Sequence, residues 1–154
     1  MSAKVLFIIA QTNFRDEELF KPKAILEKAG FKCDVASIST TFATGMLGKV
    51  VKPDIAVREV DVDDYELLVV VGGSGAPELA KYPEVLKLLA SAQDNDKKLA
   101  AICLGPVVLA KAGVLSGSKA TVFKTKESLA ALQQGGAEYV EQSVVTDLNL
   151  VTAS

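Results

Sequence analysis

Residues 67–75 read Leu-Leu-Val-Val-Val-Gly-Gly-Ser-Gly, an unbroken apolar run that ends abruptly in a glycine-rich turn. A short apolar run bounded by glycine is typical of a strand that is buried on both faces of a parallel sheet. Parallel strands need crossover connections, and stretches with helical periodicity lie on both sides of this run in the sequence. The stretch therefore predicts a central strand of an α/β fold.

Apolar runs alternate with amphipathic stretches along the rest of the chain. Residues 44–60 contain Gly45, Gly48 and Pro53 among β-branched residues, which favours a hairpin or an edge excursion over a helix. The alternation predicts a doubly wound, mostly parallel α/β sheet with helices on both faces. Strands are expected at 4–10, 32–37, 67–71, 99–102, 120–123, 144–147 and 150–152, and helices at 16–29, 83–92, 106–112 and 126–134.

Length and composition restrict the class of protein. The chain has 154 residues, of which 49% are hydrophobic and 23% charged, which is ordinary for one globular domain. A net charge of −2 argues against nucleic acid or an anionic membrane surface as a partner. The apolar runs are too short to span a bilayer, and the N-terminus shows no signal-peptide pattern, so a cytoplasmic location is expected. Two cysteines, Cys33 and Cys103, form neither a disulfide framework nor a metal site.

The segment Ala-Ala-Ile-Cys-Leu-Gly-Pro at residues 100–106 places Cys103 where a strand ends and a helix begins. A helix start favours the thiolate and lowers the pKa of a thiol. The backbone amides of Gly73 and Leu104 could approach one point beside it and hold a developing oxyanion or a sulfinate oxygen. The alternative is that Cys103 is a small buried apolar residue, an interpretation that is much stronger for Cys33, on the inward face of an alternating strand.

Ligands of open α/β sheets collect at the carboxyl ends of the strands, where the loop 12–18, the Gly72-Gly73 turn and Cys103 are expected to meet. Glu18 is the acid of interest in that loop. The competing interpretation is that Asp16, Glu17 and Glu18 only stabilise the first turn of a helix. The turn at 72–75 lacks the lysine and hydroxyl residue of a phosphate-binding loop, so that signal is weak.

Histidine is absent from the chain. An imidazole is the usual activator of a nucleophilic thiol, and this chain cannot supply one, either to itself or to an identical partner. Chemistry at Cys103 must therefore use backbone amides, a helix dipole and a carboxyl group.

The segments at residues 65–73 and 100–106, together with four others, resemble the ThiJ/PfpI superfamily, which includes the parkinsonism-associated deglycase and the archaeal intracellular proteases. The resemblance implies that Cys103 is the elbow nucleophile, that Glu18 hydrogen-bonds its sulfur, and that the amides of Gly73 and Leu104 face it. It also implies a flavodoxin-like α/β/α sandwich, no cofactor or metal, and a homodimer or larger homo-oligomer. The matching segments are 4–10, 18–22, 65–73, 100–106, 109–121 and 144–152.

The chain departs from the family pattern at three places. Leu104 stands where protease-type members carry histidine, and Val71 replaces a proline. The sequence given ends at Ser154, where such relatives continue into a final helix, so we expect a single domain over 1–154 without that helix.

Three functions stay open. The first is a cysteine enzyme of the glyoxalase or deglycase type that acts on small α-oxoaldehydes or their adducts. The second is a non-enzymatic thiol sensor or protective protein, in which an oxidant converts Cys103 to a sulfinate. A peptidase comes last, because no imidazole is present to protonate a leaving amine.

Overall fold

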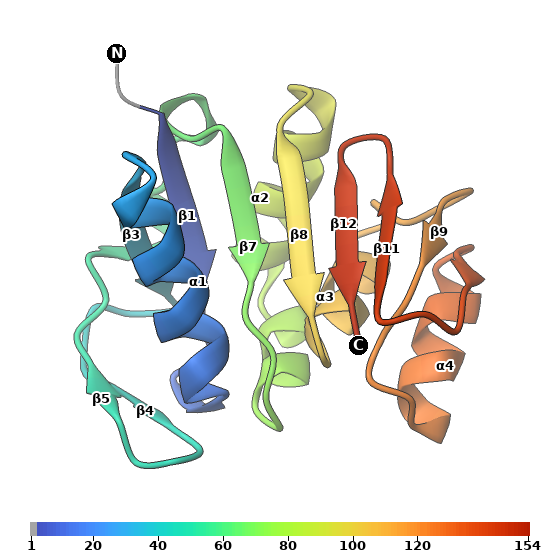
Figure 1. Ribbon diagram of the computed structural model, residues 1–154, viewed down its shortest axis with the longest axis horizontal. Helices are drawn as coiled ribbons and strands as arrows, with labels where there is room; N and C mark the ends of the chain where they lie inside the picture. Colours follow the sequence, from blue (N-terminus) through green and yellow to red (C-terminus); the bar gives the residue numbers. More distant parts are fainter. Residues whose placement is uncertain (1–2) are drawn as a thin grey trace.

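A computed structural model describes residues 3–154, and its centre is a seven-stranded sheet in the order β11-β12-β8-β7-β1-β3-β6. All neighbouring pairs in this sheet are parallel except β11 and β12, which are antiparallel. The predicted doubly wound, mostly parallel α/β fold is confirmed (Figure 1). The strands are β1 Lys4–Ile8, β3 Lys32–Ser37, β6 Ile55–Ala56, β7 Leu67–Val70, β8 Lys98–Ile102, β11 Val144–Asp147 and β12 Leu150–Ala153.

Helices cover both faces of the sheet. In Figure 1, α1 lies in front of the strands, whereas α2 and α3 lie behind them. The α-helices are α1 Asp16–Lys28, α2 Pro83–Asp94, α3 Gly105–Lys111 and α4 Lys126–Gln134, and short 3₁₀ turns lie at η1 Val57–Glu59, η2 Val62–Asp64 and η3 Ala76–Lys81.

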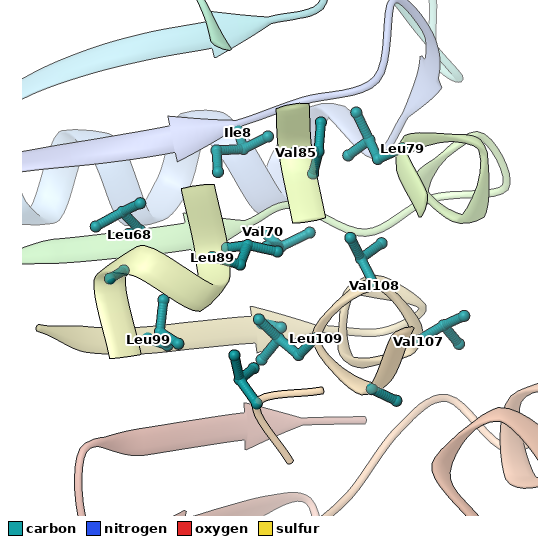
Figure 2. Close-up of a cluster of buried hydrophobic side chains, with 14 of the residues drawn as sticks. Ile8, Leu68, Val70, Leu79, Val85, Leu89, Leu99, Val107, Val108 and Leu109 are labelled. Carbon is teal, nitrogen blue, oxygen red and sulfur yellow. The ribbon is translucent and has the colours of Figure 1, made fainter. Parts of the chain in front are cut away.

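Side chains of each central strand alternate between two apolar clusters. Phe7 of β1 packs with Leu19 of α1 on the front face, while Ile8 belongs to the larger cluster behind the sheet. Figure 2 shows Ile8, Val70 and Val108 in that larger cluster, between the strands and the rear helices. The period of two along each strand makes a continuous apolar run bury both faces of the sheet.

Three parts of the chain differ from the sequence-based expectation. Residues 12–14 form a short strand, β2 Thr12–Phe14, which pairs with β4 Ala43–Gly45, and β4 pairs in turn with β5 Val50–Val51. The hairpin expected within 44–60 is therefore present, and it extends a small second sheet. The 3₁₀ turn η3 was not expected.

The third difference is the strand predicted at 120–123, which is only β9 Lys119–Ala120 and lies outside the main sheet, paired with β10 Glu138–Tyr139. Beyond β9 the backbone amides form isolated hydrogen bonds and not the regular pairing of a β-sheet. The Thr121 amide donates to Thr152 Oγ1, and the Phe123 amide donates to the Cys103 carbonyl.

Within residues 3–154, no helix has the length and apolar character needed to cross a membrane.

Candidate functional site

The elbow at Cys103 is a strained turn between β8 and α3. Cys103 has φ 61°, a left-handed conformation that non-glycine residues adopt at a cost of roughly 1–2 kcal/mol. Its amide donates to the Ala153 carbonyl at 2.9 Å, and its carbonyl accepts from the Phe123 amide at 2.7 Å. The chain therefore holds Cys103 in this conformation from two sides, which aims its side chain out of the end of the sheet.

Two glycines let the strand ends approach each other at this elbow. A Cβ atom on Gly72 would lie 2.5 Å from the Ile102 carbonyl oxygen and 2.7 Å from Cys103 Cβ. A Cβ atom on Gly105 would lie 2.5 Å from the Val70 carbonyl oxygen. Both distances are closer than real Cβ contacts, so the ends of β7 and β8 can only meet through bare backbone.

The backbone amides of Gly73 and Leu104 lie close enough to the Cys103 sulfur to favour its thiolate form. Burial raises the pKa of the Cys103 thiol, the charge of Glu18 raises it further, and the two amides and Arg15 lower it, with a net upward shift. The lowered pKa predicted from the helix start is therefore wrong. The thiol is half-buried, and its desolvation outweighs the amide contributions.

Glu18 projects from the first turn of α1 toward the end of β7. Its Oε1 accepts from the Gly72 amide at 2.9 Å, and burial raises the pKa of this carboxyl despite that bond. A Cβ atom on Gly72 would contact both Glu18 Oε1 and Cys103 Cβ, so the carboxyl and the cysteine are near neighbours. The carboxyl faces the elbow and does not cap its own helix, whose N-cap Arg15 has no side-chain cap bond.

Glu18 and Cys103 come from chain segments that follow β1 and β8, and β7 lies between these two strands. Glu18 reaches across the end of β7 because that strand terminates in Gly72-Gly73, which have no side chains in the way. A hydrogen bond between Glu18 and the Cys103 sulfur stays a prediction.

The Leu104 amide contributes to lowering the pKa of Cys103, whereas Leu104 is not among the residues that line the cavity at the thiol. The side chain lines a separate cavity with Val107 of α3 and Thr125 before α4. The site residues Cys103, Glu18, Gly73 and Leu104 thus converge at one place, while their catalytic roles stay predictions.

The thiol opens into a cavity of about 480 Å³ at the carboxyl end of the sheet. Arg15 lines this cavity and forms an ion pair with Glu17, and its backbone amide donates to the Gly72 carbonyl. Sequence reasoning missed these contributions, although Arg15 stands in the loop that was expected to reach the site. The lining residues are Arg15, Glu17, Glu18, Lys21, Pro22, Ile102, Cys103, Phe123 and Ser154.

No cluster of three or more histidine, cysteine, aspartate or glutamate side chains in the described part of the chain is arranged to hold a metal ion.

Asp16 is a buried acid with a structural role that the sequence did not reveal. Its two carboxylate oxygens accept from the amides of Leu47, at 3.0 Å, and Lys49, at 2.9 Å. Burial alone would raise the pKa of Asp16, but these amide bonds outweigh it and hold the pKa below its ordinary value. Asp16 therefore ties the β4–β5 hairpin to the start of α1.

Replacing Asp16 with alanine will destabilise the fold by about 2–3 kcal/mol, because two amides lose a charged acceptor. Thermal denaturation measures this change, with Glu17→Ala as a matched control for loss of an exposed first-turn acid. The folded pKa of Asp16 is depressed, so its contribution is complete above about pH 4 and is lost as pH falls through the folded pKa. Equal destabilisation by both variants at pH 7 would contradict this role.

Alkylation will distinguish the two thiols. Burial raises the pKa of Cys33, and its sulfur lies 4.0 Å from the Lys23 carbonyl oxygen, whereas Cys103 lines the cavity and two backbone amides oppose the upward shift of its pKa. We expect sub-stoichiometric iodoacetamide to label Cys103 first, as peptide mapping will show. Preferential labelling of Cys33 would reverse the assignment.

The chain is similar to several known proteins over almost its whole length. Residues 3–154 match the model of the DJ-1/PfpI family. An uncharacterized protein from Methanocaldococcus jannaschii is 43% identical over 153 residues, which is 99% of this chain and 75% of that protein. A deglycase from Thermococcus kodakarensis is 36% identical over 151 residues, which is 97% of this chain and 89% of the deglycase. The crystal structure of a ThiJ/PfpI domain protein from Brachyspira murdochii has a TM-score of 0.92 at 32% identity, covering 99% of this chain and 88% of that one.

Proposed function

The chain belongs to the DJ-1/PfpI family, and from this premise we propose that Cys103 is the nucleophile of a glyoxalase- or deglycase-like reaction on small α-oxoaldehydes or their adducts. The observation that carries the proposal is the strained elbow at Cys103, a residue that lines an open cavity close to the backbone amides of Gly73 and Leu104. Four relatives that are 33–36% identical are named deglycases, which supports the same substrate class.

In the proposed reaction, the Cys103 sulfur attacks the aldehyde carbon of the α-oxoaldehyde. The thiol proton passes to the Glu18 carboxylate, and the carbonyl π electrons become an oxyanion that the amides of Gly73 and Leu104 stabilise. Return of the proton to that oxygen completes a hemithioacetal.

Isomerisation then moves the former aldehyde hydrogen to the neighbouring carbon as a proton, through Glu18. The hydroxyl proton of the hemithioacetal passes to the former ketone oxygen, which leaves a 2-hydroxy thioester on Cys103. One water hydrolyses the thioester, which releases a 2-hydroxy acid and restores the thiol. The net reaction adds one water to one α-oxoaldehyde and needs no external oxidant or reductant.

Glu18 suits the role of proton shuttle because burial moves the pKa of its carboxyl upward, toward the working pH. Its negative charge also raises the pKa of Cys103. The reactive form has one proton shared between them, on the carboxyl when the sulfur is a thiolate.

Turnover of methylglyoxal by the purified protein tests the proposal, with lactate as the measured product. We expect Cys103→Ser to abolish the reaction, Glu18→Gln to reduce it by about 10²–10⁴-fold, and Cys33→Ser to leave it unchanged. Turnover that survives Cys103→Ser, or no turnover by the unmodified protein, would overturn the enzymatic proposal.

A second candidate is an oxidant-responsive protein, favoured by the two amides at the Cys103 sulfur and by the lack of an imidazole shuttle. One thiol and two molecules of hydrogen peroxide would give a sulfinate and two waters, with the sulfur oxidised and the peroxide reduced. Intact mass after mild peroxide should then show the gain of two oxygen atoms on Cys103. Absence of this gain, or its presence on Cys33, would exclude the second candidate.

A further inference from the structure

The cavity at Cys103 contains two cations, Arg15 and Lys21, and two acids, Glu17 and Glu18. The acids already have partners within the molecule. Glu17 is paired with Arg15, and Glu18 accepts from the Gly72 amide. Lys21, in contrast, has no acidic side chain within ion-pairing distance among residues 3–154. Lys21 is therefore the cation of the lining that has no acidic partner among residues 3–154.

The groups at the bottom of the cavity also favour a negatively charged partner. The amides of Gly73 and Leu104 lie near the thiol and favour its anionic form, and Arg15 uses Nε for Glu17. A small molecule that reaches the sulfur thus meets donors below it and a lysine one helical turn beyond Glu18 on α1. A partner with a negatively charged group would complement Lys21, whereas a neutral partner would leave it unused.

We propose that Lys21 favours electrophiles that carry a carboxylate near the carbon that Cys103 attacks, with Arg15 as a secondary contact. The inference rests on the proposed role of Cys103 as nucleophile and, among α-oxoaldehydes, favours those with a carboxylate beyond the ketone over neutral ones. Lys21 stands on α1 outside the hydrogen bonds that hold the elbow, so it sets which molecule enters the cavity without forming the turn itself.

Two alkylating reagents of nearly equal size test the inference without any enzymatic assay. Iodoacetate and iodoacetamide form the same C–S bond with the Cys103 thiolate and release iodide, but only iodoacetate carries a carboxylate beside the reacting carbon. The ratio of their rate constants, relative to the ratio for N-acetylcysteine, reports the preference of the cavity for an anion. A Cys33→Ser background leaves Cys103 as the single reactive thiol.

We expect the iodoacetate-to-iodoacetamide ratio of the protein to exceed that of N-acetylcysteine and to fall about threefold to tenfold in Lys21→Gln, with Lys21→Arg restoring it. Added salt should lower the ratio, because it screens the charge. Lys23→Gln is the matched control, since it removes the same charge from the same helix at a residue that pairs with Glu27.

An unchanged ratio in Lys21→Gln, or an equal fall in Lys23→Gln, would overturn the proposal. These outcomes are separate from a failure of the proposed function. Loss of methylglyoxal turnover in Cys103→Ser would still identify the nucleophile even if Lys21 had no effect on the ratio. Conversely, an anion preference without turnover would support the role of Lys21 and contradict the enzymatic proposal. Lys21 would then recognise anionic molecules that bind to Cys103 or modify it.

Discussion

Replacing Gly72 with alanine will destabilise the protein by about 3 kcal/mol and lower its melting temperature by roughly 6–12 °C. The added methyl group would lie 2.5 Å from the Ile102 carbonyl oxygen and 2.7 Å from Cys103 Cβ. Glu18 can rotate away, but the other two groups belong to a strand end and a strained elbow, which have no freedom to move. The same displacement should slow alkylation of Cys103.

Gly117→Ala is the matched control for this change. Gly117 has φ +77°, and a Cβ atom there would meet nothing within 4 Å, so the substitution introduces backbone strain without a clash. We expect a cost of about 1 kcal/mol and no change in the reactivity of Cys103. If Gly72→Ala were no more destabilising than Gly117→Ala, the close approach of β7 and β8 would not require glycine.

Peptide hydrolysis will be about 10²–10⁴-fold slower than in a family member that carries histidine directly after its elbow cysteine. An amine leaves poorly unless it is protonated, and no side chain here supplies an imidazole. Leu104 occupies the position of that histidine, and its side chain points into a different cavity. Cleavage of a fluorescent peptide by the two proteins, side by side, measures the difference.

The control for peptide cleavage is Cys103→Ser. Cleavage at the rate of the histidine-bearing relative, lost on this substitution, would show that a cysteine elbow hydrolyses peptides without imidazole. Cleavage that persists in Cys103→Ser would instead indicate a contaminating peptidase.

Much of the fold followed from local sequence patterns. The runs at 67–71 and 99–102 are apolar on both faces, and only the interior of a parallel sheet accommodates such runs. The elbow was visible because cysteine, glycine and proline stand together where a strand pattern changes into a helix pattern. The positions of Gly73 and Leu104 followed from the same two turns.

What the sequence did not reveal depends on contacts between distant segments. Asp16 appeared to be one of three first-turn acids, yet its partners are amides of residues 47 and 49, in a hairpin that sequence periodicity could not orient. The direction of the pKa shift at Cys103 depended on burial by neighbouring elements, which a helix-start argument leaves out. The truncated strand at 119–120 reflects the competition of the Cys103 carbonyl for the Phe123 amide.

The hydrogen bond from the Cys103 amide to the Ala153 carbonyl has a consequence for biosynthesis. β12 is the last strand in chain order, but it pairs with β8 inside the sheet. A chain that emerges from the ribosome can therefore assemble β1, β3, β7 and β8 while β8 is still an open edge. The elbow gains its hydrogen bond to Ala153 only after β12 pairs with β8, so Cys103 is synthesised well before this support for it exists.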